Sequence, residues 1–390
     1  MYTIQTLNKI SANGLDQLPR ENYEIATEIS NPDAVLVRSA DMLQAELPKK
    51  LKAIARAGAG VNNIPIDRCT EKGIIVFNTP GANANAVKEI VLASLLLSSR
   101  KILQGITWAQ TLKGKADEVG PLVEKGKSQF VGPEIAGKKL GVIGLGAIGI
   151  KVANDALALG MEVIGFDPFL SVEAAWGISS QVTKAASLEQ LIASADYITI
   201  HVPFSPKTKG MINKDKIALM KKDVKILNFS RGGLVVNADI LEAINAGIVS
   251  TYVTDFPDDE LLGNDKVIAV PHLGASTPES EENCAVMAAK QLRHFLEYGN
   301  IKNSVNFPEC HLDWSGKTRI TISHDNIPNM VGQITTLLAG YKINIADMLN
   351  RSKDKIGYTI IDTEDTVSDE LVEKITAVEG IKNVRLIVAE

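Results

Sequence analysis

The chain has 390 residues and a formal net charge of −5, with 45% hydrophobic and 22% charged residues. This length exceeds one ordinary core, so two or three domains are expected, and the acidic balance without a basic stripe argues against a nucleic-acid partner. No apolar run reaches 18 residues and the start resembles no signal peptide, so no membrane partner is expected. The three cysteines, Cys69, Cys284 and Cys310, lack metal-site spacing and indicate a reducing cytoplasm without a bound metal.

The first hundred residues alternate short apolar runs with amphipathic stretches. Apolar runs at 35–37, 53–55 and 74–77 predict strands of a small parallel, flavodoxin-like α/β domain. The glycine-containing loops at 56–60 and 78–83 could expose backbone N–H groups to an anion, or could be ordinary turns.

Two further segments precede the next strand. Residues 84–108 are apolar almost all round, which predicts a long helix buried between domains or between subunits. Residues 113–138 are rich in glycine and lysine and lack periodicity, so a loop or an arm is expected there.

A glycine motif lies between two strand-like runs. Gly144, Gly146 and Gly149 follow the apolar run 140–143, helical periodicity comes next, and a second apolar run ends on Asp167. This order of strand, glycine turn, helix, strand and acid is typical of a dinucleotide site. The glycines allow the tight turn, the approach of a pyrophosphate and close helix packing. A carboxylate at position 167 can accept hydrogen bonds from a ribose hydroxyl and would repel a 2′-phosphate, so NAD is favoured over NADP.

Polar residues follow three later strand signals. Strands are expected at 197–201, 225–229, 250–254 and 267–270, which predicts a doubly wound, Rossmann-type sheet. Arg231, Glu260 and His272 follow the last three strands, so they are expected to converge at one edge of the sheet. An arginine can bind a carboxylate, a histidine can exchange a hydroxyl proton and a glutamate can orient the ring. This trio suits hydride transfer with a 2-hydroxy acid, although each residue alone has an ordinary structural explanation.

The last quarter of the chain contains a helix, a linker and a small module. Thr277, Pro278 and Glu279 mark the start of a helix that ends near Gly299. Residues 300–317 look like a linker, and the order strand, helix, strand, strand, helix, strand beyond it predicts a ferredoxin-like α+β module. The predicted domains are residues 1–97 with 282–310, residues 98–281, and residues 318–390.

These motifs together resemble one enzyme family. The glycine turn at 144–149, the Ser-Arg-Gly-Gly run at 230–233, Glu260 and the run 271–277 are similar to the D-isomer-specific 2-hydroxyacid dehydrogenases. The resemblance covers nearly the whole chain, and residues 37–39, 56–62 and 78–83 add to it. The terminal module resembles an ACT domain. The resemblance implies oxidation of 3-phospho-D-glycerate to 3-phosphohydroxypyruvate, the first step of L-serine biosynthesis, with L-serine as a possible effector.

The resemblance also implies a role for each matching residue. His272 would be the acid–base, Glu260 its partner and Arg231 the anchor of the substrate carboxylate and carbonyl. Asp255 would contact the nicotinamide amide, and His201 would line the cofactor pocket. The implied cofactor set is Gly144, Gly146, Ala147, Ile148, Gly149, Asp167, His201, Val202, Pro203, Ser230, Asp255 and Gly274. The implied substrate set is Arg38, Arg56, Ala59, Gly60 and Asn83, and the implied serine set is His324, Asn326 and Asn344.

Several alternatives remain open at this stage. Arg38 or Arg56 could form a structural ion pair. Residues 125–130 lack the arginine that some relatives of the family place before Phe130, so Lys125 or Lys127 could supply a charge across a subunit boundary, or the segment could be a solvated loop. Asn329 stands where ACT loops often have glycine, and it tolerates a left-handed conformation less well. The enzyme could be of the glyoxylate/hydroxypyruvate reductase type, the chain could be a non-catalytic NAD-sensing corepressor-like protein, and the ACT module could only assemble subunits. A homodimer or homotetramer is expected from the apolar helix and the edge strands of the module.

Overall fold

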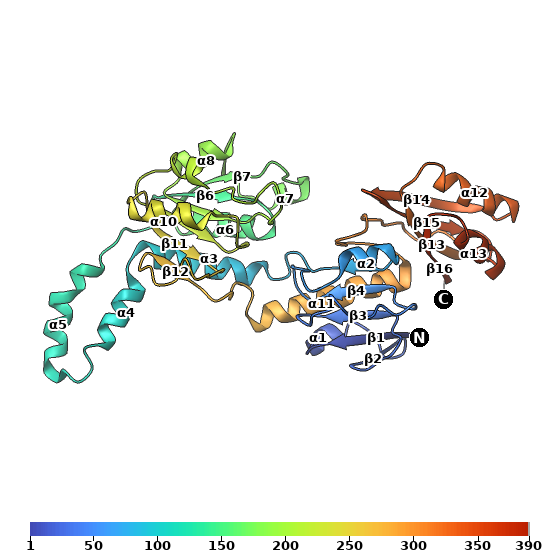
Figure 1. Ribbon diagram of the computed structural model, residues 1–390, viewed down its shortest axis with the longest axis horizontal. Helices are drawn as coiled ribbons and strands as arrows, with labels where there is room; N and C mark the ends of the chain where they lie inside the picture. Colours follow the sequence, from blue (N-terminus) through green and yellow to red (C-terminus); the bar gives the residue numbers. More distant parts are fainter. Residues whose placement is uncertain (389–390) are drawn as a thin grey trace. The chain divides into compact units, whose positions relative to one another are not determined.

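The computed structural model describes residues 1–388, and the chain divides into two compact units (Figure 1). Unit 1 comprises Met1–Asn83 and the chain from Pro278 onward, and unit 2 comprises Ala84–Thr277. The three predicted domains, with boundaries after residues 97 and 281, stay a prediction. The predicted fold class is confirmed: two parallel α/β sheets and one antiparallel α+β module are present.

The first part of unit 1 is a five-stranded parallel sheet of order β2-β1-β3-β4-β5, the flavodoxin-like order. The sequence analysis found β3, β4 and β5 and missed the first two strands, whose mixed polar and apolar residues give a weaker signal. The sheet contacts helix α11, which buries Ala285, Leu292 and Phe295 in the same core as Ile4 and Phe77. The elements are β1 (Tyr2–Leu7), α1 (Ala12–Leu15), β2 (Tyr23–Ala26), β3 (Ala34–Val37), β4 (Ala53–Arg56), α2 (Ile66–Glu71), β5 (Ile75–Phe77) and α11 (Pro278–Tyr298).

The expected linker after α11 is packed against this sheet. Asn306 is buried; its side chain accepts a hydrogen bond from the backbone N–H of Val76 and donates to the carbonyl oxygen of Ile74. Ser304 forms a β-bridge with Phe77 at the edge of the sheet. The prediction of a linker was wrong in this respect, because asparagine and serine here supply the partners that the edge strand β5 lacks.

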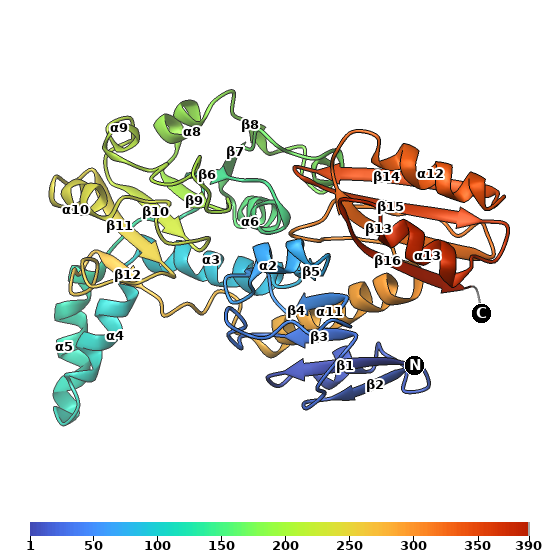
Figure 2. The same cartoon turned by 45° about the vertical axis from the view of Figure 1, so that its right-hand side comes forward.

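The remainder of unit 1 has the ferredoxin-like topology (Figure 2). Its antiparallel sheet has the order β14-β15-β13-β16, and α12 and α13 contribute Ile334, Leu338 and Ile375 to its core. Asn329 adopts a left-handed φ of +63° before α12, as its tolerance for that conformation allows. The elements are β13 (Thr318–Asp325), α12 (Met330–Gly340), β14 (Ile345–Lys353), β15 (Ile356–Thr363), α13 (Asp369–Thr376) and β16 (Ile381–Val388).

Unit 2 contains a seven-stranded parallel sheet of order β12-β11-β10-β9-β6-β7-β8. This is the doubly wound arrangement, with the chain reversing its direction of growth between β6 and β9. Its strands are β6 (Lys139–Ile143), β7 (Glu162–Phe166), β8 (Thr183–Lys184), β9 (Tyr197–Ile200), β10 (Val224–Asn228), β11 (Val249–Thr254) and β12 (Val267–Ala269). Its helices are α6 (Ala147–Ala158), α7 (Val172–Trp176), α8 (Leu188–Ser194), α9 (Lys214–Ile217) and α10 (Asn237–Asn245).

The apolar stretch from residue 84 forms two helices instead of one. Helix α3 (Ala84–Ser99) ends at Arg100, and α4 (Ile102–Gln110) continues at an angle of 72°. The predicted burial holds for half of α3, whereas α4 buries none of its residues. Among the described residues no single helix is long and apolar enough to cross a membrane, although the bent pair α3 and α4 would pass on length and composition together.

The segment after α4 is an arm with helical structure of its own. It contains the 3-10 turn η1 (Ala116–Glu118), α5 (Val119–Gly126) and the 3-10 turn η2 (Lys127–Phe130). Both views show α4 and α5 side by side (Figures 1 and 2). The ring centres of Trp108 in α4 and Phe130 in η2 lie 5.4 Å apart, so this contact joins the outgoing and the returning segments of the arm.

Candidate functional site

The glycine turn between β6 and α6 has the shape that a pyrophosphate requires. Gly144 has a φ of +91°, and a Cβ there would lie 2.6 Å from the carbonyl oxygen of His201. A Cβ on Gly149 would collide with the carbonyl oxygen of Gly144, whereas a Cβ on Gly146 would meet no atom within 4 Å. Gly144 and Gly149 are therefore needed by the fold, and Gly146 faces open space. Ala147 and Ile148 begin α6, whose free N–H groups and dipole favour a phosphate at this point.

Asp167 follows β7 directly and touches the glycine turn. One carboxylate oxygen accepts the backbone N–H of Leu145 at 2.9 Å, and the other accepts that of Phe169 at 2.8 Å. Each carboxylate oxygen can accept a second hydrogen bond, so acceptor capacity remains for ribose hydroxyls. The residues of the turn and this acid therefore fit NAD.

The loop after β9 lies against the turn from the other side. The valine side chain of Val202 would be 2.9 Å from a Cβ on Gly144, and Pro203 beside it is exposed. Burial lowers the pKa of His201 to about 3, so its ring is neutral, and its Nε2 lies 2.9 Å from the hydroxyl of Thr199. The Ser230 hydroxyl donates to the carbonyl oxygen of Ile200 at 2.6 Å and ties the loops after β9 and β10 together.

Three expected catalytic residues follow neighbouring strands of unit 2. Arg231 comes after β10, Glu260 after β11 and His272 after β12, and these strands are adjacent in the sheet. All three side chains are exposed. Arg231 donates to the carbonyl oxygen of Ser230 at 2.7 Å, and the ring of His272 lies 5.0 Å from that of Phe256. Within residues 1–388 no hydrogen bond joins His272 to Glu260, so the expected pairing is not formed in this structure.

Asp255 has contacts that sequence reasoning missed. Its carboxylate is 1% exposed and accepts the backbone N–H groups of Leu273 at 2.7 Å and Gly274 at 2.9 Å. Burial raises the pKa of this carboxyl group, and the two backbone hydrogen bonds oppose the shift. The neighbouring His272 has a left-handed φ of +52°. Asp255 therefore holds the backbone beside the histidine in a bend, and its position directly after a buried strand was the only signal for this role in the sequence.

The candidate substrate residues lie in unit 1: Arg56 is the last residue of β4, and the others lie on loops that follow β3, β4 and β5. Arg38 forms an ion pair with Glu281 of α11, and Arg56 donates through Nε to the carbonyl oxygen of Arg38 at 3.0 Å. The carbonyl oxygen of Ala59 accepts from the side chain of Asn78 at 2.6 Å. Gly60 follows in the same loop, and Asn83 lies in the turn before α3. The structural ion pair left open for Arg38 is present, and both of its side chains are about two-fifths exposed.

The three candidate serine residues are not brought together within one chain. His324 is buried, with its Nε2 2.9 Å from the Thr359 hydroxyl, and it pairs with Gly357 across the sheet. The side chain of Asn326, nearby, donates to the carbonyl oxygen of Asp354 at 3.1 Å. Asn344 donates to the carboxylate of Glu364, which follows Thr363 at the other end of β15. Asn344 and His324 therefore lie at opposite ends of the same sheet.

The glycine turn, the carboxylate of Asp167 after β7 and the seven-stranded sheet define unit 2 as an NAD-binding domain of the Rossmann type. Residues 92–274 match the family "D-isomer specific 2-hydroxyacid dehydrogenase, NAD binding domain".

Curated relatives extend the match beyond this domain. A D-3-phosphoglycerate dehydrogenase from Methanocaldococcus jannaschii is 34% identical over 335 residues, which are 84% of this chain and 61% of the relative. The Bacillus subtilis enzyme of that name is 34% identical over 82% of this chain and 62% of its own. The chain thus spans less than two thirds of the length of these relatives.

Solved structures agree on the fold. The NAD+-bound 3-phosphoglycerate dehydrogenase of Entamoeba histolytica is 25% identical, with a TM-score of 0.61, over 78% of this chain and 98% of that one. A glyoxylate reductase from Paecilomyes thermophila, at 24% identity and a TM-score of 0.64 over 78% of this chain and 98% of that one, shows the fold alone.

Proposed function

We propose that this chain is an NAD-dependent dehydrogenase that oxidises 3-phospho-D-glycerate to 3-phosphohydroxypyruvate, the first step of L-serine biosynthesis. The observation that carries the proposal is the position of Arg231, Glu260 and His272 after three adjacent strands of an NAD-binding sheet. The names of the curated relatives support the choice of substrate.

In the proposed reaction the C2 hydroxyl group of the substrate becomes a carbonyl group. The bound NAD+ supplies the hydride acceptor for the hydrogen on C2. The imidazole of His272 takes the hydroxyl proton, since a histidine side chain can serve as a general base and later return the proton. The Arg231 guanidinium binds the substrate carboxylate through parallel hydrogen bonds and polarises the forming carbonyl.

Two carboxylates support the histidine in this proposal. Asp255 fixes the backbone on the carboxyl side of His272 through Leu273 and Gly274. Glu260 would orient the ring and favour its protonated form, which requires its exposed loop to move toward the histidine. A Glu260→Gln variant should therefore lower kcat/KM.

In the same proposal, residues of unit 1 bind the negatively charged groups of the substrate. The backbone N–H groups of Ala59 and Gly60 would bind the substrate carboxylate. Asn83, which directly precedes α3, belongs to the same proposed substrate site. Arg38 or Arg56 would meet the phosphate. For Arg38 this means exchanging its exposed contact with Glu281, a pair worth little in water.

We further propose that the ferredoxin-like module is an ACT domain that binds L-serine between two copies of the chain. The opposite positions of His324 and Asn344 in the sheet support a shared site, because one copy cannot offer both. This implies a homodimer or homotetramer, in the reducing cytoplasm that the three buried free thiols suit. Calorimetry with L-serine should give heat with the wild type and none with Asn344→Ala; no heat with either leaves the module an assembly device.

The direct test of the activity is NADH formation in a substrate panel. The protein should form NADH with 3-phospho-D-glycerate and NAD+, and NADP+ should be a poor substitute. Activity with lactate, glycerate or glyoxylate but not with 3-phospho-D-glycerate would retain the family and refute the proposed substrate.

A further inference from the structure

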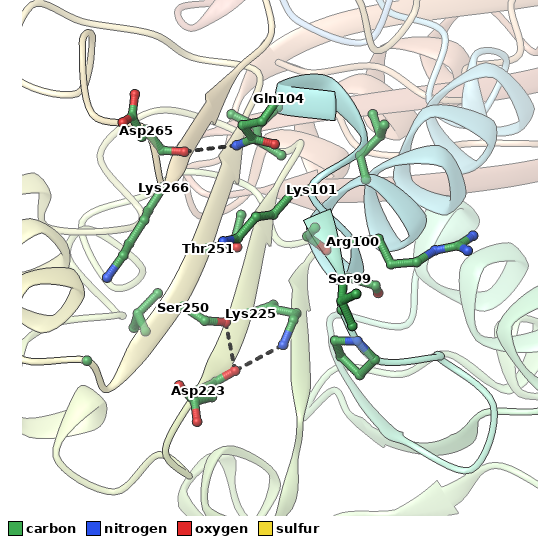
Figure 3. Close-up of a pocket in the computed structure, with 18 residues that line it drawn as sticks. Ser99, Arg100, Lys101, Gln104, Asp223, Lys225, Ser250, Thr251, Asp265 and Lys266 are labelled. Carbon is green, nitrogen blue, oxygen red and sulfur yellow. Dashed lines mark hydrogen bonds between the residues drawn. The ribbon is translucent and has the colours of Figure 1, made fainter. Parts of the chain in front are cut away.

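A pocket in unit 2 lies where the strands begin. It has a volume of about 490 Å³ and is lined by the starts of β10 and β11, the end of α3 and the first turn of α4 (Figure 3). Arg231, Glu260 and His272 follow the other ends of these strands. The pocket is therefore separate from the candidate catalytic loops, and its volume is in the range of sites for small metabolites.

Positive charge is concentrated in this pocket. Arg100, Lys101, Lys225 and Lys266 line it, against the carboxylates of Asp223 and Asp265. Among residues 1–388, none of these six side chains takes part in an ion pair shorter than 4.0 Å. In a chain with a net charge of −5, this pocket is thus lined by more cationic than anionic side chains.

Lys225 is the deepest of the four cations. Its residue is 9% exposed, and its Nζ lies 5.0 Å from the centre of the Tyr197 ring. One hydrogen bond holds the ammonium group, to the carbonyl oxygen of Asp223 at 3.1 Å (Figure 3). An ammonium group has three donors, and its charge is opposed only at longer range by the carboxylates of Asp223 and Asp196, so its burial is costly. An anion in the pocket would offset this cost.

The other three cations also retain donors. Lys101 and Lys266 reach the carbonyl oxygens of Gln129 and Ile244 only at 3.4 Å, the long limit of a hydrogen bond. The Arg100 guanidinium has no side-chain partner within the described chain. Hydrogen bonds from side chains to the backbone hold the segments that line the pocket. The Ser250 hydroxyl donates to the carbonyl oxygen of Asp223 at 2.8 Å, and the Gln104 side chain donates to the carbonyl oxygen of Asp265 at 3.3 Å.

We propose that this pocket binds a small multivalent anion that carries phosphate or carboxylate groups. Lys225 would hold one anionic group at the base, and Arg100, Lys101 and Lys266 would bind further groups around the opening. Two or more negative charges on the ligand would balance the excess of cations over the two aspartates.

The test is calorimetric titration of the full chain with inorganic pyrophosphate and, separately, with citrate, at constant ionic strength. Saturating NADH is present throughout and occupies the glycine turn, so that binding of a phosphate probe at the turn does not contribute to the signal. Saturable binding of either probe is expected, and the two arms tell phosphate from carboxylate recognition. The double variant Arg100→Gln/Lys101→Gln should weaken binding at least tenfold, and Lys225→Met should do the same. Lys184→Gln, an exposed lysine on β8, should bind as the wild type does.

Two results would overturn the proposal. The first is a failure of the binding test, either because neither probe binds saturably or because the wild type and the Arg100/Lys101 variant bind equally. The second is a change of mass in light scattering for that variant, which would assign the pocket to an interface between copies. Arg100 and Lys101 are exposed, so this variant should fold even where Lys225→Met does not.

Discussion

The buried carboxylate of Asp255 holds the backbone N–H of Gly274 at 2.9 Å, two residues beyond the proposed acid–base His272. Its second oxygen binds the N–H of Leu273, so both hydrogen bonds act on the chain immediately after the histidine. A carboxylate that accepts two backbone donors in a buried place cannot be replaced by an amide without leaving a donor unpaired. Asp255 therefore fixes the backbone that directly follows His272.

The Asp255→Asn variant should therefore lower kcat. We expect a loss of roughly tenfold or more from displacement of His272 and a destabilisation of about 1–3 kcal/mol from the unpaired N–H group. Steady-state kinetics and urea unfolding measure the two effects. A rise in the KM for NAD+ alone, with unchanged kcat and stability, would show that the side chain serves only the coenzyme.

Two glycines of the turn should respond differently to alanine. Gly146→Ala has room for its methyl group and should unfold at the wild-type temperature, while the methyl group obstructs the pyrophosphate and weakens NADH binding at least tenfold. Gly149→Ala collides with the Gly144 carbonyl and should destabilise unit 2. Thermal melting together with NADH fluorescence titration separates these effects. Equal melting temperatures for both variants would contradict the geometry of the turn.

Asp167 should control the choice of coenzyme. An Asp167→Ala variant removes the repulsion of a 2′-phosphate and the acceptor for ribose hydroxyls, so the preference for NAD+ over NADP+ should fall by roughly 100-fold. The ratio of kcat/KM for the two coenzymes measures this. The loss of the Leu145 contact should affect both coenzymes alike, and an unchanged ratio would remove Asp167 from the ribose site.

Much of the fold was predictable because local patterns and tertiary packing agree. The glycine turn, Asp167 and the ferredoxin-like order follow from periodicity and from residues that the backbone geometry requires. The bend at Arg100 was missed, although the polar run from Ser98 to Lys101 interrupts the apolar pattern just before α4. The roles of Asp255 and Asn306 were not predictable, because hydrogen bonds to distant backbone groups leave no periodic trace. The pocket around Lys225 was not predictable either, because its cationic residues lie at a strand start, at a helix end and in a loop that are far apart in the sequence.

Asp33 should make stability depend on pH. Burial disfavours its charged form, but hydrogen bonds from Lys50, Lys52 and the backbone of Thr3 outweigh burial and lower its pKa from 3.8 to about 2. A lowered pKa stabilises the folded state above pH 3.8, and this contribution disappears as the pH falls toward 2. Asp33→Asn should thus cost about 2 kcal/mol at neutral pH and little at pH about 2.

Urea unfolding across this pH range checks the prediction for Asp33. Asp117→Asn, an exposed position in the arm, serves as the control and should follow the wild type throughout. A difference between Asp33→Asn and the wild type that stays constant with pH would show that the carboxylate charge is not the cause.

The most direct measurement is the rate of NADH formation from 3-phospho-D-glycerate and NAD+ by the wild type and by His272→Ala. We predict a fall in kcat of roughly 100- to 10,000-fold, with NADH affinity and melting temperature close to those of the wild type. A His272→Ala variant that keeps the wild-type rate would contradict the assignment of the proton transfer to His272.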